Sequence, residues 1–471
     1  MSHVSRADWQ ALVRREMRNV EEPGSPKFWS PELETLSPDE LASRQSVKVA
    51  AAYRYLWDCS TFYREKFERA GLGPESVRGL ADLPRVPVTH PGEWLSDQAE
   101  HPPWGRFSPL REEDWKSRGW MLFSTSGTTA AQPRMFRHTT FDQEMWTWHG
   151  ARALYAMGVR RGDVALNCFA YGTSVAFWGL HHALTRMGVP IVSGGGASTE
   201  RRVQLARLAQ PSVVLGTPSY LLHLGREFAR SGEPPQSVRR LVAAGEVGAS
   251  LVSTRRRLEA AWNARAHDDF GCTEVAMSPL GYTCEADDEN DGRNPHLMED
   301  QYVVEALSPD TWEPVADGTP GTLVVSNLFS ESLPILRYAM GDWITLLRTP
   351  CACGRTHARA EGGLRGRNDD VVKIKGLKFY PATVEDAVRS MTEAGDEFRV
   401  EISAPEGLDR VRIVIEEGPL GPGDPRALGK RVSGLLGIEV TVELVPAGTL
   451  PAVTAKAKRF FDLRTSHLGN A

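Results

Sequence analysis

Between Trp120 and Phe270 the chain alternates short apolar runs with segments of helical length, and this alternation limits the possible folds more than any other feature. The apolar runs read GWMLF, DVALNCF, VPIV, SVVLG and RRLVAA. Each run is followed by a stretch in which apolar residues recur at helical spacing. Continuous apolar strands joined by helices are typical of a largely parallel sheet that helices cover on both faces. The sequence therefore predicts an α/β fold.

The chain on either side of this region has a different pattern. Residues 1–115 read as helices and loops with a proline-rich connector at Pro84–Trp94. Residues 302–347 contain the runs QYVVEAL, GTLVVSN and WITLL with DG and PG turns, which predict an antiparallel subdomain. The last hundred residues alternate strand-like and helical runs and predict a small α+β domain. We place the boundary in the charged segment RGRNDD, so that residues 1–368 form a large domain and residues 369–471 a small one.

Composition and charge exclude several classes of protein. The 471 residues contain 55 Lys and Arg against 60 Asp and Glu, a formal net charge of -5, so no basic excess favours a nucleic-acid partner. No apolar run approaches the ~18 residues of a membrane-spanning helix, and the N-terminal residues mix both charges, unlike a signal peptide. The 6 cysteines are too few for a disulfide scaffold. We therefore expect a cytoplasmic protein that binds neither nucleic acid nor membrane.

A run of small hydroxyl residues follows the first apolar strand and is the strongest local signal. Such residues fold tightly and offer hydroxyls and backbone N–H groups to phosphate oxygens. The run consists of Ser124, Thr125, Ser126, Gly127, Thr128 and Thr129. Taken alone, this stretch can also be interpreted as a solvated Ser/Thr loop that binds no ligand.

Further motifs extend in order from near the start of the chain to near its end. They read FWSPELETLSPDEL, YGTSVAFWGLHHAL, TPSYLLHL, AAGE, FGCTEV, LPILRYAMGD, PCACGRTHAR, RGRNDDVVKIKGLKFYP and KAKRFFDLR. In this combination the chain resembles the acyl-adenylate-forming enzymes, and within them the phenylacetate–CoA ligase family. The resemblance implies a large adenylate-forming domain and a small mobile C-terminal domain. It also implies a two-step reaction, in which a carboxylate attacks the α-phosphate of ATP to give acyl-AMP and pyrophosphate, and a thiol then displaces AMP.

The resemblance assigns several residues to nucleotide binding. Glu274 matches the glutamate associated with Mg²⁺, which prefers hard oxygen ligands, and Thr273 beside it is placed to donate its hydroxyl to the α-phosphate. Asp342 matches the aspartate that accepts hydrogen bonds from both ribose hydroxyls, and Arg367 is implied near the ribose or the phosphates. The segment Ala244-Gly245-Glu246 resembles the lining of the adenine pocket. Each of these residues also has a purely structural alternative, such as a helix cap or a turn.

An aromatic cluster and a lysine near the C-terminus complete the implied catalytic apparatus. Aromatic residues occupy the segment that lines the acid site in relatives; they suit a flat or apolar acid but are also ordinary core residues. They are Phe169, Tyr171, Phe177, Trp178 and His181. Lys456 matches the family's catalytic lysine, whose charge bridges the attacking carboxylate and the phosphate. Lys458, two residues away, is the rival assignment.

The segment between the two predicted domains is implied to act as a hinge. In relatives the small domain rotates after adenylation so that the thiol can enter, and Asp369 or its neighbour Asp370 takes the hinge position here. Gly376 is then expected beside the thiol tunnel, where a side chain would obstruct. The sequence departs from the family at residues 130–134, where Ala-Ala-Gln-Pro-Arg stands in place of the Gly-Lys-Pro of many relatives. Arg134 is the candidate substitute for the missing cation.

Three cysteines and a histidine match a metal-binding set found in many relatives. They are Cys284, His296, Cys351 and Cys353. Three thiolates and an imidazole form a closed tetrahedral Zn²⁺ site, which is structural because no position is left for water. Reduced cysteines and a surface histidine are the alternative.

We therefore predict an ATP- and Mg²⁺-dependent ligase that activates a small carboxylic acid of the aryl or arylacetic type and transfers it to the thiol of CoA. One alternative passes the acyl group to a carrier-protein thiol or to an amine, because no motif identifies the acceptor. A second is a non-catalytic nucleotide-binding homologue, against which the joint presence of Glu274, Asp342 and Lys456 argues. No motif encodes the identity of the acid or the oligomeric state, for which a homodimer is one option.

Overall fold

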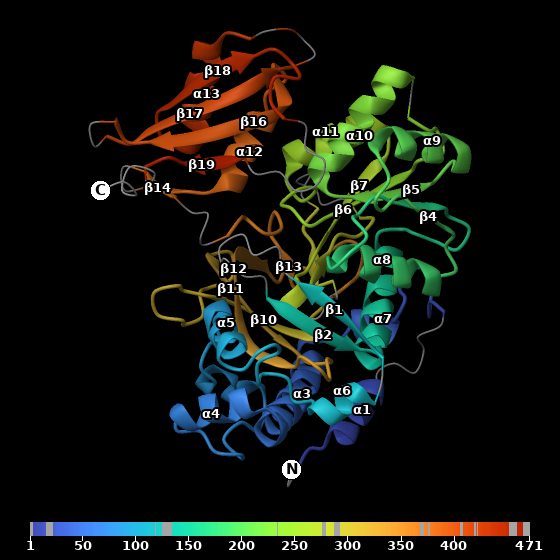
Figure 1. Cartoon of the computed structure of the whole chain (residues 1–471), viewed down its shortest axis with the longest axis vertical. Coiled ribbons are helices and arrows are strands. Elements are labelled where there is room, and N and C mark those ends of the chain that lie inside the picture. The colour runs from blue at the N-terminus through green and yellow to red at the C-terminus, as the bar shows by residue number, and fades with distance from the viewer. Residues whose placement is uncertain are drawn as a thin grey trace.

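The computed structural model shows a large unit built on one eleven-stranded sheet, joined to a smaller unit near the C-terminus (Figure 1). It describes residues 3–15, 22–117, 119–124, 134–232, 234–275, 279–286, 293–367, 372–374, 377–405, 408–418, 421, 423–451 and 459–464. Within these residues no helix has both the length and the apolar character needed to cross a membrane.

One half of the large sheet is parallel, as the alternating sequence predicts. Its strands are β3 (Ala165–Asn167), β4 (Ile191–Ser193), β5 (Val213–Gly216), β6 (Arg240–Ala244) and β7 (Arg265–Phe270). The accompanying helices are α7 (Thr140–Ala156), α8 (Val175–Arg186), α9 (Thr199–Ala209), α10 (Pro218–Ser231) and α11 (Val252–Trp262). Alternate residues of β6 enter different cores: Leu241 and Ala243 pack with α9, α10 and α11, whereas Val242 belongs to the cluster that contains α7 and α8.

The first predicted strand of the series does not join this sheet. β1 (Trp120–Ser124) pairs in antiparallel register with β2 (Met135–Thr139), and the two form a separate two-stranded sheet. The expectation that GWMLF starts the parallel series is therefore wrong. The segment between β1 and β2 is too short for a parallel crossover, which takes about a dozen residues or more, so the two strands pair as a hairpin.

The other half of the large sheet is antiparallel, as predicted for the chain around residues 302–347. Its strands are β10 (Tyr302–Leu307), β11 (Pro320–Asn327) and β12 (Ile335–Leu347), followed by the short strands β13 (Arg359–Ala360), β9 (His296–Leu297) and β8 (Gly281–Tyr282). The complete order is β10-β11-β12-β13-β9-β8-β7-β6-β5-β3-β4. The antiparallel region therefore continues the parallel one within a single mixed sheet.

Helices from the first hundred residues pack against the antiparallel half. They are α1 (Arg6–Arg14), α2 (Pro31–Glu34), α3 (Pro38–Cys59), α4 (Thr61–Arg69), α5 (Pro91–Glu100) and, further on, α6 (Glu112–Lys116), with a 3-10 helix at Leu80–Arg85. α3 starts at a capping box, in which the hydroxyl of Ser37 accepts from the Glu40 N–H and the Glu40 carboxylate accepts from the Ser37 N–H. Its buried Lys48 donates to the carbonyl of Asp300 at 2.9 Å, which anchors the helix beside β10.

The smaller unit has its own sheet and its own core, as expected for an α+β domain. Its elements are β14 (Val372–Ile374), β15 (Leu377–Phe379), α12 (Pro381–Arg389), β16 (Ala394–Ser403), β17 (Arg410–Glu417), α13 (Pro425–Leu436), β18 (Val440–Val445) and β19 (Phe460–Asp462). Four of the strands form a sheet in the order β18-β17-β16-β19, while β14 and β15 pair as a hairpin. A separate cluster that includes Val400, Ile413 and Val432 fills the space between this sheet and its helices. In Figure 1 this unit, in orange and red, lies above the large sheet and beside α11.

The two units meet through a polar contact centred on α11. Arg257 donates hydrogen bonds to four backbone carbonyls at and after the end of α12, at 2.8–3.0 Å, and pairs with the Asp396 carboxylate at 2.8 Å. Arg226 of α10 pairs with Glu397 at 2.8 Å. Charge-assisted hydrogen bonds of this kind are stronger than neutral ones, so they define one orientation of the small unit.

Candidate active site

Three of the predicted site segments begin where parallel strands end. The segment Ala244-Gly245-Glu246 follows β6, the segment that ends at Glu274 follows β7, and Phe169 and Tyr171 follow β3. Because these strands are parallel, their carboxyl ends lie along one edge of the sheet. In open α/β sheets, ligands bind at that edge. The fold therefore places along one edge the residues expected to contact adenine, the α-phosphate and the acid.

The predicted adenine segment is a tight turn held against a helix. Gly245 has φ +86°, a left-handed conformation that side chains disfavour, so the turn itself requires glycine. The carboxylate of Glu246 accepts a hydrogen bond from the backbone N–H of Ser219, in the first turn of α10, at 3.3 Å. The sequence left open a purely structural reason for this glycine, and the left-handed conformation of the turn supplies that reason.

Glu274, the predicted magnesium ligand, lies in a 3-10 helix at Thr273–Val275 and is buried. Its Oε1 lies 2.6 Å from Nη2 of Arg134, the residue that precedes β2. Nη1 of the same guanidinium lies 3.5 Å from the hydroxyl of Tyr338 in β12. Burial raises the pKa of Tyr338 well above its ordinary value, so its hydroxyl stays protonated.

Asp342, predicted to bind the ribose, lies beside Arg367, predicted near the ribose or the phosphates. Asp342 of β12 forms an isolated β-bridge with Arg367. Gly341, which precedes Asp342, has φ +82°, and a Cβ there would lie 3.4 Å from Nη2 of Arg367, so glycine leaves room for the guanidinium. The backbone N–H of Trp343 donates to the carbonyl of Gly366 at 2.9 Å and holds the two segments side by side.

Only the first residue of the predicted phosphate run is described. Ser124 ends β1, where its Oγ donates to Oγ1 of Thr173 at 3.0 Å and its backbone N–H donates to the Thr173 carbonyl at 3.1 Å. Outside the described residues lie Thr125, Ser126, Gly127, Thr128 and Thr129, and likewise Asp369, Asp370, Gly376, Lys456 and Lys458.

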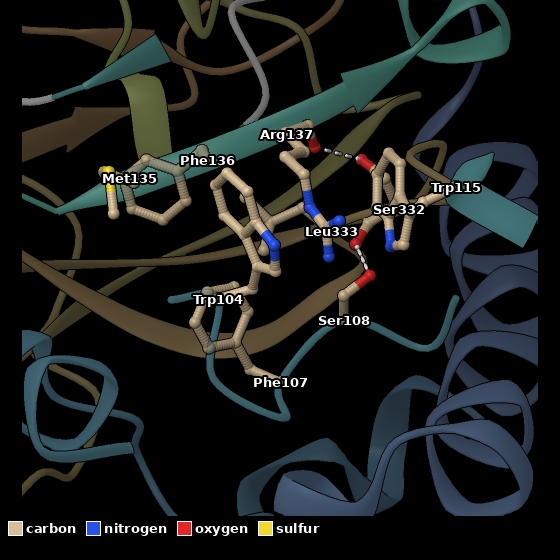
Figure 2. A pocket seen from close by; sticks show the side chains of 9 residues that line it. All are labelled: Trp104, Phe107, Ser108, Trp115, Met135, Phe136, Arg137, Ser332 and Leu333. Atoms are coloured by element: carbon tan, nitrogen blue, oxygen red, sulfur yellow. Dashed lines mark hydrogen bonds between the residues drawn. The ribbon is translucent and has the colours of Figure 1, made fainter. Parts of the chain in front are cut away.

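The hairpin on either side of that run is held by an arginine among tryptophans. Figure 2 shows the Arg137 guanidinium of β2 between the rings of Trp104 and Trp115, and its carbon lies 4.3 Å from both ring centroids. Trp120, the first residue of β1, adds a third ring at 5.7 Å. Glu112 pairs with the guanidinium at 2.7 Å from α6. Cation–π contacts with little exposure to water contribute about 1–2 kcal/mol each, so this tryptophan cage fixes both strands.

The predicted acid-pocket residues form one aromatic cluster. The ring centroids of Tyr171 and Trp178 lie 4.6 Å apart, those of Tyr171 and Phe177 5.1 Å apart, and His181 stacks on Phe177 at 5.6 Å. Phe177 is 2% exposed and contributes to the core, whereas Tyr171 is 62% exposed. Phe169 precedes them at the end of β3 and is also buried. One side of the cluster therefore belongs to the protein core, and the other side is exposed to solvent.

The predicted zinc residues converge. The ligand atoms of Cys284, His296, Cys351 and Cys353 lie within 4.8 Å of one another, and all four residues are buried. The Sγ atoms of Cys284 and Cys351 are 3.8 Å apart, which is the separation of about 3.8 Å that a tetrahedral ion with 2.3 Å Zn–S bonds requires. Hydrogen bonding from Cys284 and then from Cys351 lowers the pKa of the Cys353 thiol and favours the thiolate that binds metal. The donor set therefore fits Zn²⁺.

Comparison with known proteins decides the family. The chain is 30% identical over 458 residues to a phenylacetate-coenzyme A ligase of Thermus thermophilus, and the match covers 93% of this chain and 100% of that protein. The chain belongs to the phenylacetate–CoA ligase family. Residues 376–464 also match the family described as AMP-binding enzyme C-terminal domain. Membership confirms the prediction of an ATP-dependent, AMP-forming acid–CoA ligase and favours neither alternative.

Solved structures indicate which domain arrangement this ligase adopts here. A 2-hydroxyisobutyryl-CoA ligase in the postadenylation state with 2-HIB-AMP matches with a TM-score of 0.87 at 26% identity, covering 97% of this chain and 96% of that chain. The same ligase in the thioesterification state with 2-HIB-AMP and CoA gives 0.70 at 27% identity, covering 94% of each. One protein therefore gives two scores in two named states at nearly the same identity and coverage. The present arrangement therefore resembles the postadenylation state.

Two buried carboxylates of this ligase belong to none of the sequence motifs. Asp268 and Asp269 are consecutive in β7, and burial raises their pKa values to about 6 and about 7. Asp268 accepts a hydrogen bond from the backbone N–H of Ser250 at 3.1 Å, whereas Oδ1 of Asp269 has no hydrogen-bond partner in the described part of the chain. The available signal is the unusual pair of aspartates in a strand directly before the FGCTE motif.

Proposed function

We propose that this ligase activates an aryl or arylacetic acid as its acyl-AMP and transfers the acyl group to CoA. The observation that carries the proposal is the aromatic cluster of Tyr171, Phe177, Trp178 and His181 at the edge where the parallel strands end. Flat rings bury large area against such a wall and stack with it in offset or edge-to-face geometry. The relative from Thermus thermophilus, which is named for phenylacetate, supports the same class of acid.

The nucleotide is expected along the edge formed by β6, β7 and β12. Asp342 accepts from the ribose hydroxyls, Arg367 stands beside it, and the Gly245 turn lies against the adenine base. Thr273 donates to the α-phosphate, and the run that begins with Ser124 binds the remaining phosphates. The adjacency of Asp342 and Arg367 supports this assignment.

Glu274 is the proposed ligand for Mg²⁺, and its surroundings fit that ion. Magnesium is usually held by one or two carboxylates together with substrate phosphates and water, so a single buried glutamate is sufficient. The Arg134 guanidinium at 2.6 Å shows that the carboxylate already stabilises positive charge. When bound, the ion neutralises charge that develops on the phosphates. Lys456 is the proposed side-chain cation that bridges the attacking carboxylate and the α-phosphate.

The second half-reaction is proposed to follow a rotation of residues 369–471 about Asp369, which admits the thiol of CoA past Gly376. The separate core of the smaller unit supports its movement as one body. The match of residues 376–464 to a C-terminal domain family supports the same division.

The cluster of three cysteines and His296 is proposed to hold a structural Zn²⁺. It joins the chain after β8 to the chain after β12, and a fourfold protein ligand set leaves no catalytic position. Thiols that bind metal must stay reduced, which favours a cytoplasmic location for the protein.

Acid-dependent pyrophosphate release across a panel of acids tests the proposed function. Phenylacetate and benzoate analogues are compared with small aliphatic hydroxy acids, each with CoA, a carrier protein or amines supplied as acceptor. We expect turnover with aryl acids and CoA. Preference for an aliphatic acid would overturn the acid class, and pyrophosphate release that does not depend on any acid would overturn the ligase assignment.

A further inference from the structure

The ion pair between Arg134 and Glu274 joins two segments that are remote in the sequence. The guanidinium and carboxylate side chains are 15% and 8% exposed, so water screens their 2.6 Å contact only weakly. The nearby Tyr338 hydroxyl limits where the guanidinium can lie. The arginine therefore occupies the one carboxylate to which the proposed function assigns Mg²⁺.

Two cations compete for this carboxylate. An arginine side chain stays charged at every physiological pH, so the pair does not dissolve by loss of a proton. A divalent cation beside Glu274 would repel the guanidinium at short range. Arg134 and a divalent cation therefore compete for Glu274, because both neutralise the same negative charge.

The nucleotide phosphates are the acceptor that the proposed function offers to a displaced guanidinium. Arg134 follows directly on the predicted phosphate run, and residues 130–133 read Ala-Ala-Gln-Pro and carry no positive charge. The planar guanidinium presents five N–H donors that match pairs of phosphate oxygens. It is thus the cation that this segment can supply to the nucleotide.

Resting on the proposed function, we propose that the Arg134 guanidinium exchanges between two partners, the Glu274 carboxylate and the nucleotide phosphates. In the protein without nucleotide it neutralises Glu274, and when Mg²⁺–ATP engages Glu274 it transfers to the phosphates and stabilises their charge during adenylation. Arg134 is on this proposal a catalytic residue that also lowers the affinity of the free protein for divalent cations.

The test measures metal affinity and turnover in the same full-length variants. Mn²⁺ binding to the protein without nucleotide is followed by electron paramagnetic resonance, and pyrophosphate release is measured with the acid preferred in the panel. In Arg134→Gln the removal of the competing cation should tighten Mn²⁺ binding by about 5–150-fold, the usual range of coupling between sites. The rate of adenylation should fall by on the order of 10²–10³.

Matched variants separate this role from a structural one. Arg134→Lys keeps the charge, so Mn²⁺ affinity should stay near that of wild type while the rate falls less than in Arg134→Gln. The double variant Arg134→Gln with Glu274→Gln should lose the gain in Mn²⁺ affinity. Arg111→Gln, at a 76% exposed arginine that pairs with Asp114, is the control and should change neither quantity.

Either of two results with Arg134→Gln would overturn the inference. They are an Arg134→Gln protein whose Mn²⁺ affinity is unchanged or weaker, or one whose adenylation rate is normal. Arg134→Met, which keeps the aliphatic packing, replaces Arg134→Gln if the melting curve shows that the latter is unfolded. Wild-type protein that fails to release pyrophosphate with every acid contradicts the proposed function, whereas unchanged Mn²⁺ affinity in an active Arg134→Gln protein contradicts only the inference.

Discussion

Lys456 is flanked by residues with defined contacts on both sides. The backbone N–H of Leu450 donates to Glu416 at 2.8 Å, and Arg459 pairs with Glu397 at 2.9 Å and donates to the hydroxyl of Ser219 at 3.3 Å. Ser219 is also the residue whose N–H binds the predicted adenine turn. Arg459, three residues after Lys456, therefore contacts the residue that holds the turn expected to bind adenine.

We predict that Lys456→Ala slows acyl-AMP formation by on the order of 10²–10³, because an oriented ammonium acts mainly on charge in the transition state. ATP affinity should change little, and transfer to CoA from chemically prepared acyl-AMP should remain close to wild type. Single-turnover kinetics of the two half-reactions provide the measurement.

Lys458→Ala is the internal control for this prediction and should be nearly silent in both half-reactions. The reverse pattern, with adenylation lost in Lys458→Ala and kept in Lys456→Ala, would show that the assignment is displaced by two residues. Two silent variants would remove the catalytic lysine from the proposed mechanism.

Asp269 should make the stability of this ligase depend on pH. Burial, and then the neighbouring Asp268, raise the pKa of Asp269 from 3.8 to about 7 in the folded state. The folded state therefore binds the proton more tightly than the unfolded state, and this contribution to stability is complete below about pH 4 and is lost as the pH rises through 7.

We predict that Asp269→Asn gains stability relative to wild type as the pH rises from 4 to 7. Each pH unit in that window contributes up to about 1.4 kcal/mol to the difference in unfolding free energy. Urea unfolding of both proteins at several pH values provides the comparison. A difference that stays constant with pH would contradict the raised pKa.

At the scale of elements, the thiol cluster joins strands that are far apart in the sequence. Cys284 follows β8, His296 begins β9, and Cys351 and Cys353 follow β12. Because ligands from separate strands meet only in the folded chain, metal binding there contributes directly to folding. A bound ion would stabilise the junction between the parallel and antiparallel halves of the sheet.

We predict about one zinc per chain in purified protein by elemental analysis, the stoichiometry of a single four-ligand site. Cys351→Ser should lower both the zinc content and the melting temperature, and Cys168→Ser, a buried cysteine outside the cluster, should keep the zinc. Metal-free wild-type protein that is stable in chelator would exclude the zinc site.

The β1–β2 hairpin is an element with little core of its own. A two-stranded hairpin is only marginally stable in water, so its position depends on what it packs against. Phe123 and Phe136 enter the main core. The tryptophan cage around Arg137 adds to this hold, as does Ser332, whose hydroxyl donates to the Arg137 carbonyl at 3.1 Å. The predicted phosphate run connects the two strands. We therefore expect the cage to act on nucleotide binding through the hairpin.

We predict that Arg137→Met raises KM for ATP by about tenfold, equivalent to about 1.4 kcal/mol of lost positioning. Because Arg137 does not contact the reacting atoms, kcat at saturating ATP should fall less than KM rises. Arg137→Lys should recover part of the effect, since it keeps the charge among the rings. A variant that loses kcat and keeps KM would assign Arg137 a different role.

At the scale of the whole molecule, one arginine holds much of the contact between the two units. Arg257 uses its guanidinium on four carbonyls and on Asp396 of the smaller unit. The structure resembles the postadenylation arrangement of a related ligase more closely than its thioesterification arrangement. These contacts therefore stabilise one of the two states between which the domains are expected to alternate.

We predict that Arg257→Ala loosens the docked arrangement by at least about 1.5 kcal/mol, the contribution of one charge-assisted hydrogen bond. Small-angle scattering should show a larger radius of gyration, and acyl-AMP formation should slow while transfer from supplied acyl-AMP is maintained. Arg230→Ala, at an exposed arginine of α10 that pairs with Glu227 of the same helix, is the control. An unchanged scattering curve would show that other contacts hold the domain.

The sequence by itself determined the α/β class, the two units and the positions of the motifs. Burial imposes a local apolar period on strands and helices, and each motif is a short contiguous string, so both can be read from neighbouring residues. The convergence of Cys284, His296, Cys351 and Cys353 was predicted because the resemblance supplied the set.

Only the tertiary structure decided which partners the remaining residues take. GWMLF has the pattern of a parallel strand, yet β1 pairs with β2, because pairing depends on which strand is within reach. Arg134 meets Glu274 across 140 positions of sequence, and the acceptors of Arg257 belong to another unit. Contacts between such distant residues leave no local period in the chain, and their strength comes from burial that exists only after folding.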